Sequence, residues 1–272
     1  MSKYIKIEIE TSSKEQLEIL IAELSEINFE AFEENENSLS AFIREECFNE
    51  NDLKEIILAN DVSYTKSIIV NTNWNAKWES EFEPIIIEDF VAVRAAFHEP
   101  IANVKYDIII TPKMSFGTGH HATTYLMLQQ MQNINFSGKT VLDFGTGTGI
   151  LAIMAKKLNA KDIVAIDNDE WSINNAKENF AANNCSEILL IQKDNLGGLE
   201  KFDIILANIN LNVITNSIDQ FKCVTHQSSL LLLSGFLVTD ENVLTESFSA
   251  AGFKLFALSK KNEWLSMLLT KS

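Results

Sequence analysis

One short stretch, residues 140–149, carries the residue types best suited to holding a ligand. It reads T-V-L-D-F-G-T-G-T-G, and a carboxylate, Asp167, follows further along the chain. Because glycine lacks a Cβ, Gly145, Gly147 and Gly149 let the backbone pass close to a bound molecule. A carboxylate at the end of the following strand can accept hydrogen bonds from both hydroxyls of a ribose. The stretch therefore predicts a ligand with an adenosine-like part and leaves open which one.

Two buried strands and one helix must position these residues. One apolar strand ends at Asp143, and residues 163–166 form a second, which ends at Asp167. Residues 150–158 between them predict a helix whose first turn offers unpaired N–H groups to polar ligand atoms. A strand, a helix and a second strand in this order indicate a βαβ unit.

A second informative stretch, residues 114–124, reads M-S-F-G-T-G-H-H-A-T-T and precedes a predicted helix over residues 125–131. Its glycines and threonines favour a loop that folds over a ligand. His120 and His121 raise the question of a metal site. Adjacent side chains point in different directions, however, and no HxxxH or CxxC pattern supplies further ligands. We therefore expect no metal and interpret the loop as a wall near the cofactor.

The remaining strands complete a sheet. A helix is expected over residues 171–183, and further strands over residues 187–191, 202–207, 229–235, 252–258 and 264–270. The turn at residues 259–263 is too short for a parallel crossover, so the final strand must be antiparallel. An α/β, doubly wound sheet of seven strands with an antiparallel last strand is typical of methyltransferases. The spacing G-x-G-x-G, in place of G-x-G-x-x-G, favours the same interpretation once Asp167 and the terminal hairpin are added.

These motifs resemble one family. The runs F-G-T-G-H-H-A-T-T, D-F-G-T-G-T-G-I-L-A-I, I-D-N-D and L-A-N-I resemble the PrmA-type methyltransferases of bacterial ribosomal protein L11, over almost all of residues 74–272. The resemblance implies a class I methyltransferase that uses S-adenosylmethionine. It implies transfer of methyl groups to lysine side chains and the N-terminal amine of that ribosomal protein. The family's cofactor contacts fall on Thr124, Gly145, Asp167 and Asn208.

The expected cofactor-binding set also includes Phe116, Gly147 and Asp194. Asp194 follows the third strand of the sheet, where a carboxylate can face the adenine amino group. The sequence departs from the family after Asn208, because the residues that follow, I-N-L, are not the small or proline residues common there. The shape of the amine pocket is left open by this departure.

Asn208 is the candidate catalytic residue. Methyl transfer is an in-line displacement at a sulfonium, so the enzyme mainly aligns donor and acceptor. The accepting amine must be neutral, and deprotonating a lysine at pH 7 costs roughly 4–5 kcal/mol, which desolvation reduces. We predict that an oxygen of Asn208 accepts a hydrogen bond from the amine and aims its lone pair. The alternative roles are helix caps, for Asn208 after the fourth strand and for Thr124 before its helix.

A separate small domain is expected at the start of the chain. Alternating isoleucines in residues 4–10, two helical stripes and a hairpin give the order β-α-β-β-α-β, with the helices beginning at Ser12 or Ser13 and at Asn51 or Asp52. That order predicts a ferredoxin-like α+β domain over residues 1–70, which we interpret as the substrate-recognition domain. A connecting segment over residues 71–100 follows, with tryptophans that we expect to pack the domains together. The methyltransferase domain then spans residues 101–272.

The charge of the chain favours a basic partner. The net charge is −16, and residues 1–60 hold 15 acidic against 5 basic side chains. Nucleic-acid binding depends on Lys and Arg neutralising phosphates, so direct nucleic-acid binding is not expected. The first domain is either a solvated acidic surface or a docking surface for a basic protein. Ribosomal protein L11 would be such a protein.

Composition limits the compartment. No apolar run approaches the length of a membrane span and no signal peptide is apparent. The three cysteines, Cys47, Cys185 and Cys223, lack metal-like spacing and are expected to be free core thiols in a reducing cytoplasm. We expect a cytoplasmic monomer.

Three other functions remain open. A methyltransferase of the same fold could act on another protein or on a small-molecule amine. A nicotinamide-dependent oxidoreductase could use the same ribose carboxylate. A ribosome-assembly protein could bind the adenosine ligand without turnover.

Overall fold

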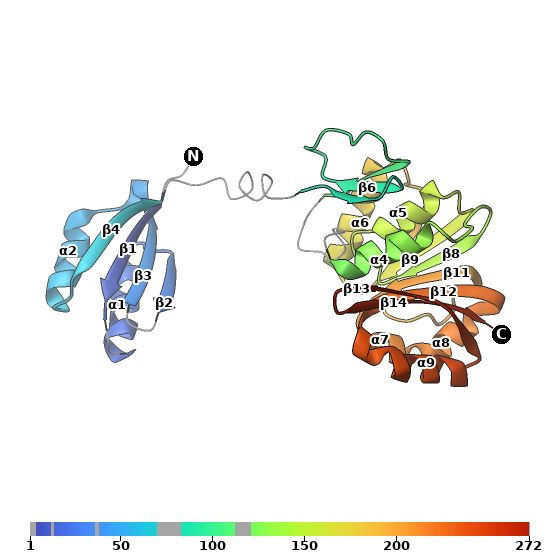
Figure 1. Cartoon of the computed structure of the whole chain (residues 1–272). Helices are drawn as coiled ribbons and strands as arrows, with labels where there is room; N and C mark the ends of the chain where they lie inside the picture. Colours follow the sequence, from blue (N-terminus) through green and yellow to red (C-terminus); the bar gives the residue numbers. More distant parts are fainter. Residues whose placement is uncertain (1–3, 12–13, 36–37, 70–82, 112–120, 272) are drawn as a thin grey trace. The chain divides into compact units, whose positions relative to one another are not determined.

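The computed structural model describes residues 4–11, 14–35, 38–69, 83–111 and 121–271 (Figure 1). The chain divides into two compact units, Met1–Glu81 and Phe82–Ser272. Each unit has a hydrophobic core of its own. The tryptophan-containing segment at residues 73–79 lies outside the described residues.

The first unit is a four-stranded antiparallel sheet with two helices. Its elements are β1 (Tyr4–Glu10), α1 (Lys14–Glu26), β2 (Ala31–Asn35), β3 (Ser38–Arg44), the short 3-10 helix η1 (Glu45–Cys47), α2 (Glu50–Ala59) and β4 (Tyr64–Ile69). The strands lie in the order β2-β3-β1-β4, and every neighbouring pair is antiparallel.

Strand alternation builds the core of this unit. Ile5, Ile7 and Ile9 are buried, and the leucines of α1 and α2, including Leu20 and Leu53, pack in the same cluster. Burying such side chains stabilises the unit by roughly 1.5–3 kcal/mol each. The second helix begins at Glu50, earlier than expected, because the side chain of Asn49 accepts the N–H of Asn51 and caps the helix there.

The second unit is built on a seven-stranded sheet. Its strands are β8 (Thr140–Phe144), β9 (Asp162–Asp167), β10 (Leu189–Gln192), β11 (Phe202–Asn208), β12 (Thr225–Leu237), β13 (Phe253–Lys261) and β14 (Trp264–Lys271). The order is β10-β9-β8-β11-β12-β14-β13. Strands β8 to β12 are parallel to one another, and β14 is antiparallel to β12 and to β13. The last strand therefore lies inside the sheet, and β13 forms its edge.

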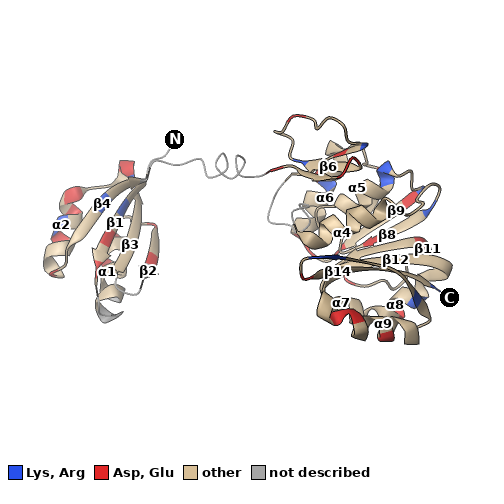
Figure 2. Cartoon of the chain, viewed as in Figure 1, with Lys and Arg blue, Asp and Glu red and all other residues tan. Residues whose placement is uncertain are grey.

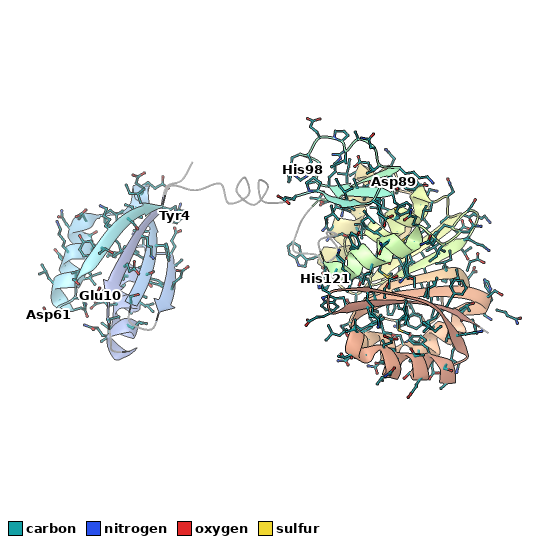
Figure 3. All side chains as sticks on the ribbon, in the orientation of Figure 1. Tyr4, Glu10, Asp61, Asp89, His98 and His121 are labelled. Carbon is teal, nitrogen blue, oxygen red and sulfur yellow. The ribbon has the colours of Figure 1, made fainter. Side chains whose placement is uncertain are left out.

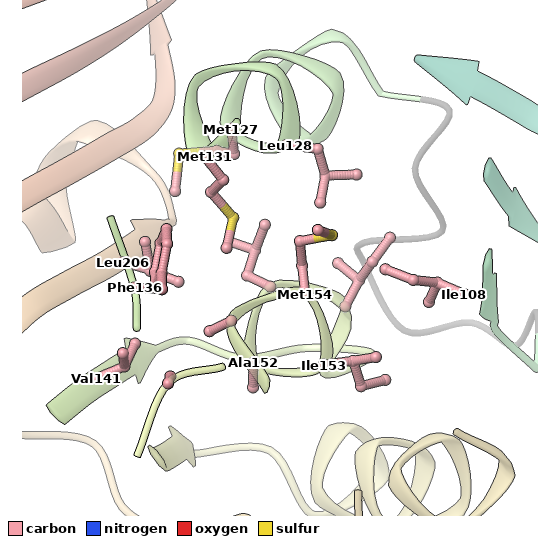
Figure 4. Close-up of a cluster of buried hydrophobic side chains, with 14 of the residues drawn as sticks. Ile108, Met127, Leu128, Met131, Phe136, Val141, Ala152, Ile153, Met154 and Leu206 are labelled. Atoms are coloured by element: carbon pink, nitrogen blue, oxygen red, sulfur yellow. The ribbon is translucent and has the colours of Figure 1, made fainter. Parts of the chain in front are cut away.

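Helices cover both faces of this sheet (Figure 1). They are α4 (Ala122–Met131), α5 (Ile150–Lys157), α6 (Glu170–Ala182), α7 (Leu211–Asn216), α8 (Ile218–Cys223) and α9 (Glu241–Ala250), with a short 3-10 helix, η2 (Val238–Asp240). Neighbouring residues of β8 face opposite sides, since Val141 belongs to one core cluster and Leu142 to the other. Figure 4 shows the first cluster, where side chains of α4 and α5 meet Val141 and Leu206.

A small three-stranded sheet joins the second unit and corrects the expected boundary at residue 101. Strands β5 (Ile85–Ile87), β6 (Val91–Arg94) and β7 (Tyr106–Ile109) lie in the order β5-β6-β7. Their apolar side chains, Ile87 and Val93 among them, share the core cluster of α4 and α5. The second unit therefore begins at Phe82, within the segment expected to be a connector.

Two expectations from composition can be compared with the structure. Among the described residues, no helix combines the length and apolar character needed to cross a bilayer. All three cysteines are free, but Cys47 and Cys223 are exposed and only Cys185 is buried. The expectation of three core thiols is therefore wrong for two of them, which lie at the ends of short surface helices.

Candidate functional site

A cavity of about 560 Å³ lies where three parallel strands end. Phe144 ends β8, Asp167 ends β9 and Asn208 ends β11, and all three line the cavity. The other lining residues are His121, Gly145, Gly147, Asn168, Ser172, Lys193, Asp194, Ile209, Asn210, Val213, Gly235 and Trp264. The volume suits a small molecule or cofactor, and ligands of open α/β sheets bind at the carboxyl ends of the strands.

The glycine turn forms one wall of this cavity. Gly145, Gly147 and Gly149 all have positive φ, at 74°, 54° and 82°, a region that favours glycine. A Cβ on Gly145 would collide with the side chain of Ile209, and one on Gly149 would lie 2.5 Å from Cε1 of Phe180. The turn is therefore closed on both sides by packing as well as by its dihedral angles.

Asp167 holds the turn and keeps hydrogen-bonding capacity for a ligand. Its Oδ2 accepts the N–H of Gly147 at 2.9 Å, and its Oδ1 accepts the N–H of Asp169 at 3.0 Å. An ionised carboxylate has about four acceptor positions, so about two remain. Together with the lining position of Asp167, this capacity fits two ribose hydroxyls. Helix α6 is capped by Asp169, whose Oδ2 accepts the N–H of Ser172.

Asp194 also lines the cavity. It follows the end of β10, which is the neighbour of β9 in the sheet. Its Oδ1 accepts a hydrogen bond of 2.6 Å from Nδ2 of Asn195. Asn168, Ser172 and Lys193 also line this part of the cavity, and sequence reasoning did not single them out. Each of these three residues follows a predicted strand end by a few positions, and this is the feature of the sequence that could have indicated them.

Asn208 and Thr124 form a pair. Nδ2 of Asn208 donates to Oγ1 of Thr124 at 3.2 Å, and Thr124 is fully buried. Oδ1 of Asn208 is buried and has no hydrogen-bond partner among the described residues. Leaving a buried acceptor without a partner costs about 1–3 kcal/mol, so this oxygen is a candidate to accept a hydrogen bond from a ligand.

Neither Asn208 nor Thr124 caps a helix, so the alternative role considered for each of them is wrong. Helix α7 is capped by Asn210, whose side chain accepts the N–H of Val213. Helix α4 is capped by His121, which accepts the N–H of Thr123. Thr124 contacts Asn208 and is not among the residues that line the cavity, so its predicted cofactor contact stays a prediction.

An aromatic wall stands at the β14 side of the cavity. The rings of His121 and Trp264 meet edge to face, with centroids 4.4 Å apart. Burial lowers the pKa of the His121 imidazole below its ordinary value, which favours the neutral ring. At the end of β13, Nζ of Lys261 lies 3.8 Å from the ring centroid of Tyr125. Trp264 and His121, both half-buried, therefore give the cavity an aromatic side.

Ile209 closes the floor between two glycines. A Cβ on Gly235, whose φ is 100°, would collide with the backbone carbonyl of Ile209, and Gly145 faces the Ile209 side chain. The segment after Asn208 is thus packed against both neighbouring strands. Ile209 is larger than the residues common at this position in the family, and Gly145 and Gly235 provide the space that its side chain and backbone occupy.

Two further predictions concern the loop before α4. Phe116 and His120 lie outside the described residues. Among the residues that the structure describes, no group of three or more His, Cys, Asp or Glu side chains could hold a metal ion.

Asp143 lies beneath the turn as a buried carboxyl group. Its Oδ2 accepts Oγ1 of Thr146 at 2.6 Å and the N–H of Ala152 at 3.2 Å, while Oδ1 has no partner among the described residues. Desolvation raises the pKa of Asp143 from 3.8 to about 7, and the nearby charge of Asp167 adds to the rise.

This shift predicts how stability changes with pH. Because the folded pKa lies above the unfolded value, the contribution of Asp143 is fully present below pH 3.8 and is lost as pH rises to about 7. Between pH 5 and 8 the loss amounts to about 2–3 kcal/mol. Urea unfolding of the protein and of Asp143→Asn at several pH values measures it. The free energy of unfolding of the parent should fall more steeply, and parallel curves would contradict the assignment.

Comparison with known proteins settles the family. The family model described as ribosomal protein L11 methyltransferase (PrmA) matches residues 4–272. The chain belongs to the ribosomal protein L11 methyltransferase family. A family member from Bacteroides fragilis is 38% identical over 259 residues, covering 92% of each chain. Another, from Porphyromonas gingivalis, is 39% identical over 261 residues, covering 93% of this chain and 90% of the relative.

A solved structure of the family agrees in fold. The ribosomal protein L11 methylase from Lactobacillus delbrueckii subsp. bulgaricus is 26% identical, with a TM-score of 0.65 over 70% of this chain and 100% of that one. The second unit therefore has the α/β methyltransferase fold with a mostly parallel central sheet. The resemblance read from the motifs is confirmed at the level of the family.

Proposed function

We propose that this protein transfers methyl groups from S-adenosylmethionine to lysine side chains and the N-terminal amine of ribosomal protein L11. The observation that carries the proposal is the buried, unpartnered Oδ1 of Asn208 at a cavity that also contains Asp167 and the glycine turn. Family membership supports the same reaction, since relatives across 92% of the chain carry that name.

The cavity residues fit S-adenosylmethionine. Asp167 has free acceptor positions for ribose hydroxyls, Asp194 is available to an amino group, and the backbone of Gly145 and Gly147 lines the cavity. When bound, the cofactor supplies an electrophilic methyl group on a sulfonium. The chain itself supplies position and exclusion of water.

Asn208 is the residue that we assign to the acceptor amine. A neutral amine donates one N–H to Oδ1 of Asn208, and its lone pair is then directed by that hydrogen bond. Thr124 fixes the amide from behind through its contact with Nδ2. Desolvation of the acceptor amine in the site would favour its neutral form, so we assign no side-chain base.

The reaction has a direct test. Incubate the purified protein with ribosomal protein L11 and isotope-labelled S-adenosylmethionine, and map the modified residues by mass spectrometry. Label on lysine and N-terminal amines of L11 is the expected result. If another protein or a small amine is labelled and L11 is not, the proposed substrate is wrong. If the protein binds a nicotinamide cofactor and not S-adenosylmethionine, the proposed reaction is wrong.

The first unit supports a role in substrate recognition. Its order of elements and its strand order β2-β3-β1-β4 support a ferredoxin-like domain. Since Ile7 and Ile9 face the helices, Glu8 and Glu10 face the other side of the sheet. Both line a groove of about 840 Å³ together with Asp61. Glu10 and Asp61 are labelled in Figure 3.

We call this hollow the acidic groove. It is lined by Glu8, Glu10, Thr11, Gln16, Ser38, Asp61, Val62, Ser63, Tyr64 and Thr65. None of these lining residues is basic, and acidic side chains predominate over basic ones in the unit as a whole (Figure 2). Such a surface attracts a basic protein and raises its rate of association. The groove is therefore the part of the first unit that we assign to docking L11.

Neutralising the acidic groove tests this role. In the triple variant Glu8→Gln, Glu10→Gln, Asp61→Asn, the KM for L11 should rise several-fold, by about three- to ten-fold at low salt, because electrostatic attraction is lost. The turnover number and cofactor affinity should not change. The measurement is steady-state methylation at two salt concentrations, since screening reduces the difference.

A matched control removes the same charge elsewhere in the first unit. Glu46, Asp52 and Glu55 are exposed, on η1 and α2. The variant Glu46→Gln, Asp52→Asn, Glu55→Gln should keep the KM of the parent. If both triple variants raise KM equally, overall charge, and not the groove, is responsible.

We further propose a cytoplasmic monomer without direct nucleic-acid contact. Free cysteines suit a reducing compartment, and a net charge of −16 disfavours phosphate binding.

A further inference from the structure

Three asparagines stand at intervals of four residues on one side of helix α6. Asn175, Asn179 and Asn183 have exposed fractions of only 1%, 0% and 9%. Asparagine is mostly found at the surface, and a buried amide must find hydrogen-bond partners. This buried row therefore has a use within the fold.

Two of these asparagines bind the backbone of β7 and of the residues just after it. Asn183 accepts the N–H of Ile109 at 3.0 Å and donates to its carbonyl at 2.6 Å. One turn closer to the cavity, Oδ1 of Asn179 accepts the N–H of Thr111 at 2.8 Å. Four helix residues rise about 6 Å and two strand residues span about 6.6 Å, so the two spacings match. Side-chain amides thus take the place of a neighbouring strand at Ile109, the last residue of β7, and at Thr111 beyond it, while the other edge of β7 pairs with β6.

Asn179 alone of these two also reaches the glycine turn. Its Nδ2 donates to the carbonyl of Thr148 at 2.8 Å, and its second proton approaches Oδ1 of Asn175 at 3.3 Å. The N–H of the same peptide, that of Gly149, donates to the carbonyl of Thr146 at 2.8 Å. The peptide between Thr148 and Gly149 is therefore held at both its oxygen and its nitrogen.

Asn183 makes no such connection. Besides Ile109, its amide contacts only the carbonyl of Asn179 within α6, at 2.8 Å. Neither asparagine lines the cavity. The two residues are alike in type and are both buried, and each binds backbone at or just after the end of β7. Only Asn179 also binds the glycine turn.

We infer that Asn179 is a positioning residue of the cofactor site. It fixes the peptide plane at Thr148, and through it the neighbouring Gly147, whose N–H is bound by Asp167. The same side chain also holds the backbone of Thr111, two residues after the end of β7. Asn179 therefore ties the glycine turn and the backbone after β7 to one helix, and it does so without lining the cavity. This inference rests on the proposed cofactor.

The test compares Asn179→Ala with Asn183→Ala. Binding of S-adenosylhomocysteine is measured by calorimetry, and thermal unfolding is measured for both. Each variant loses buried hydrogen bonds and should unfold at a lower temperature than the parent. Only Asn179→Ala should weaken S-adenosylhomocysteine binding, by about ten-fold or more, with Asn183→Ala within about two-fold of the parent.

A second readout needs no ligand. Hydrogen exchange of the amides of residues 145–149 should be faster in Asn179→Ala than in Asn183→Ala, because the turn has lost its anchor. If Asn179→Ala does not fold, Asn179→Ser carries the same comparison with a smaller change in volume.

The outcomes are separable. Equal affinity and equal turn exchange in the Asn179 and Asn183 variants would overturn the positioning role. Failure of the parent protein to bind S-adenosylhomocysteine would instead overturn the proposed cofactor, while the exchange comparison would still decide whether Asn179 anchors the turn.

Discussion

Replacing Asn208 by alanine is expected to slow methyl transfer about a hundred-fold or more, because the amine loses the acceptor that aims its lone pair. The change should reduce turnover much more than it reduces cofactor affinity. Single-turnover methylation of L11 measures the first quantity, and calorimetry with S-adenosylhomocysteine measures the second. The structural basis is the buried Oδ1, which has no partner among the described residues, and the contact of Nδ2 with Thr124.

A neighbouring asparagine provides the control for this variant. Asn212 lies on α7, is exposed and does not line the cavity. Asn212→Ala should retain the turnover of the parent. A normal rate in Asn208→Ala with intact cofactor affinity would remove Asn208 from the mechanism.

Replacing Asp167 by alanine is expected to weaken cofactor binding by about 1.5–3 kcal/mol, which is roughly ten- to 150-fold in affinity. The carboxylate supplies acceptors for the ribose and also holds the N–H of Gly147 at 2.9 Å. Calorimetric titration with S-adenosylhomocysteine measures the loss. Asp167→Asn should lose less, because an amide oxygen can still accept one of these hydrogen bonds.

The same strand offers a matched aspartate. Asp162 begins β9, at the opposite end from Asp167, and its side chain is 63% exposed. Asp162→Ala should bind S-adenosylhomocysteine as the parent does. Undiminished affinity in Asp167→Ala would rule out the ribose assignment.

The central part of the site was predictable because it depends on strand ends. In a parallel sheet the carboxyl ends of neighbouring strands meet at one edge, so Gly145, Asp167 and Asn208 are brought together by topology alone. Their types then indicate the ligand. The antiparallel hairpin of β13 and β14 was predictable for a similar reason, since five residues cannot make a parallel crossover.

Contacts between distant elements could not be predicted in this way. Trp264 reaches the cavity because β14 is inserted between β12 and β13, and nothing local to the tryptophan indicates that position. The pairing of Ile209 with Gly145 and Gly235 requires the backbone spacing of three strands. Sequence periodicity reports the face of an element and not its distance from a neighbour.

The asparagines of α6 show a second limit. The sequence predicts a helix over residues 171–183 but does not single out Asn179 or Asn183, because asparagine is mostly found at the surface. Their burial follows from the edge of β7, which was assigned to no sheet. The boundary expected at residue 101 has the same cause, since the small sheet of β5, β6 and β7 has few residues and weak alternation.

The place of β14 in the sheet has a consequence for synthesis of the protein on the ribosome. The first unit has all four of its strands once Ile69 has emerged, so it can fold while the rest is being made. The second unit cannot, because β12 and β13 have no contact in the sheet until β14 is placed between them. Until then, the apolar residues of β12 and the edge of β13 remain uncovered. The first unit can therefore be complete before the second, whose cavity gains Trp264 only when β14 is placed in the sheet.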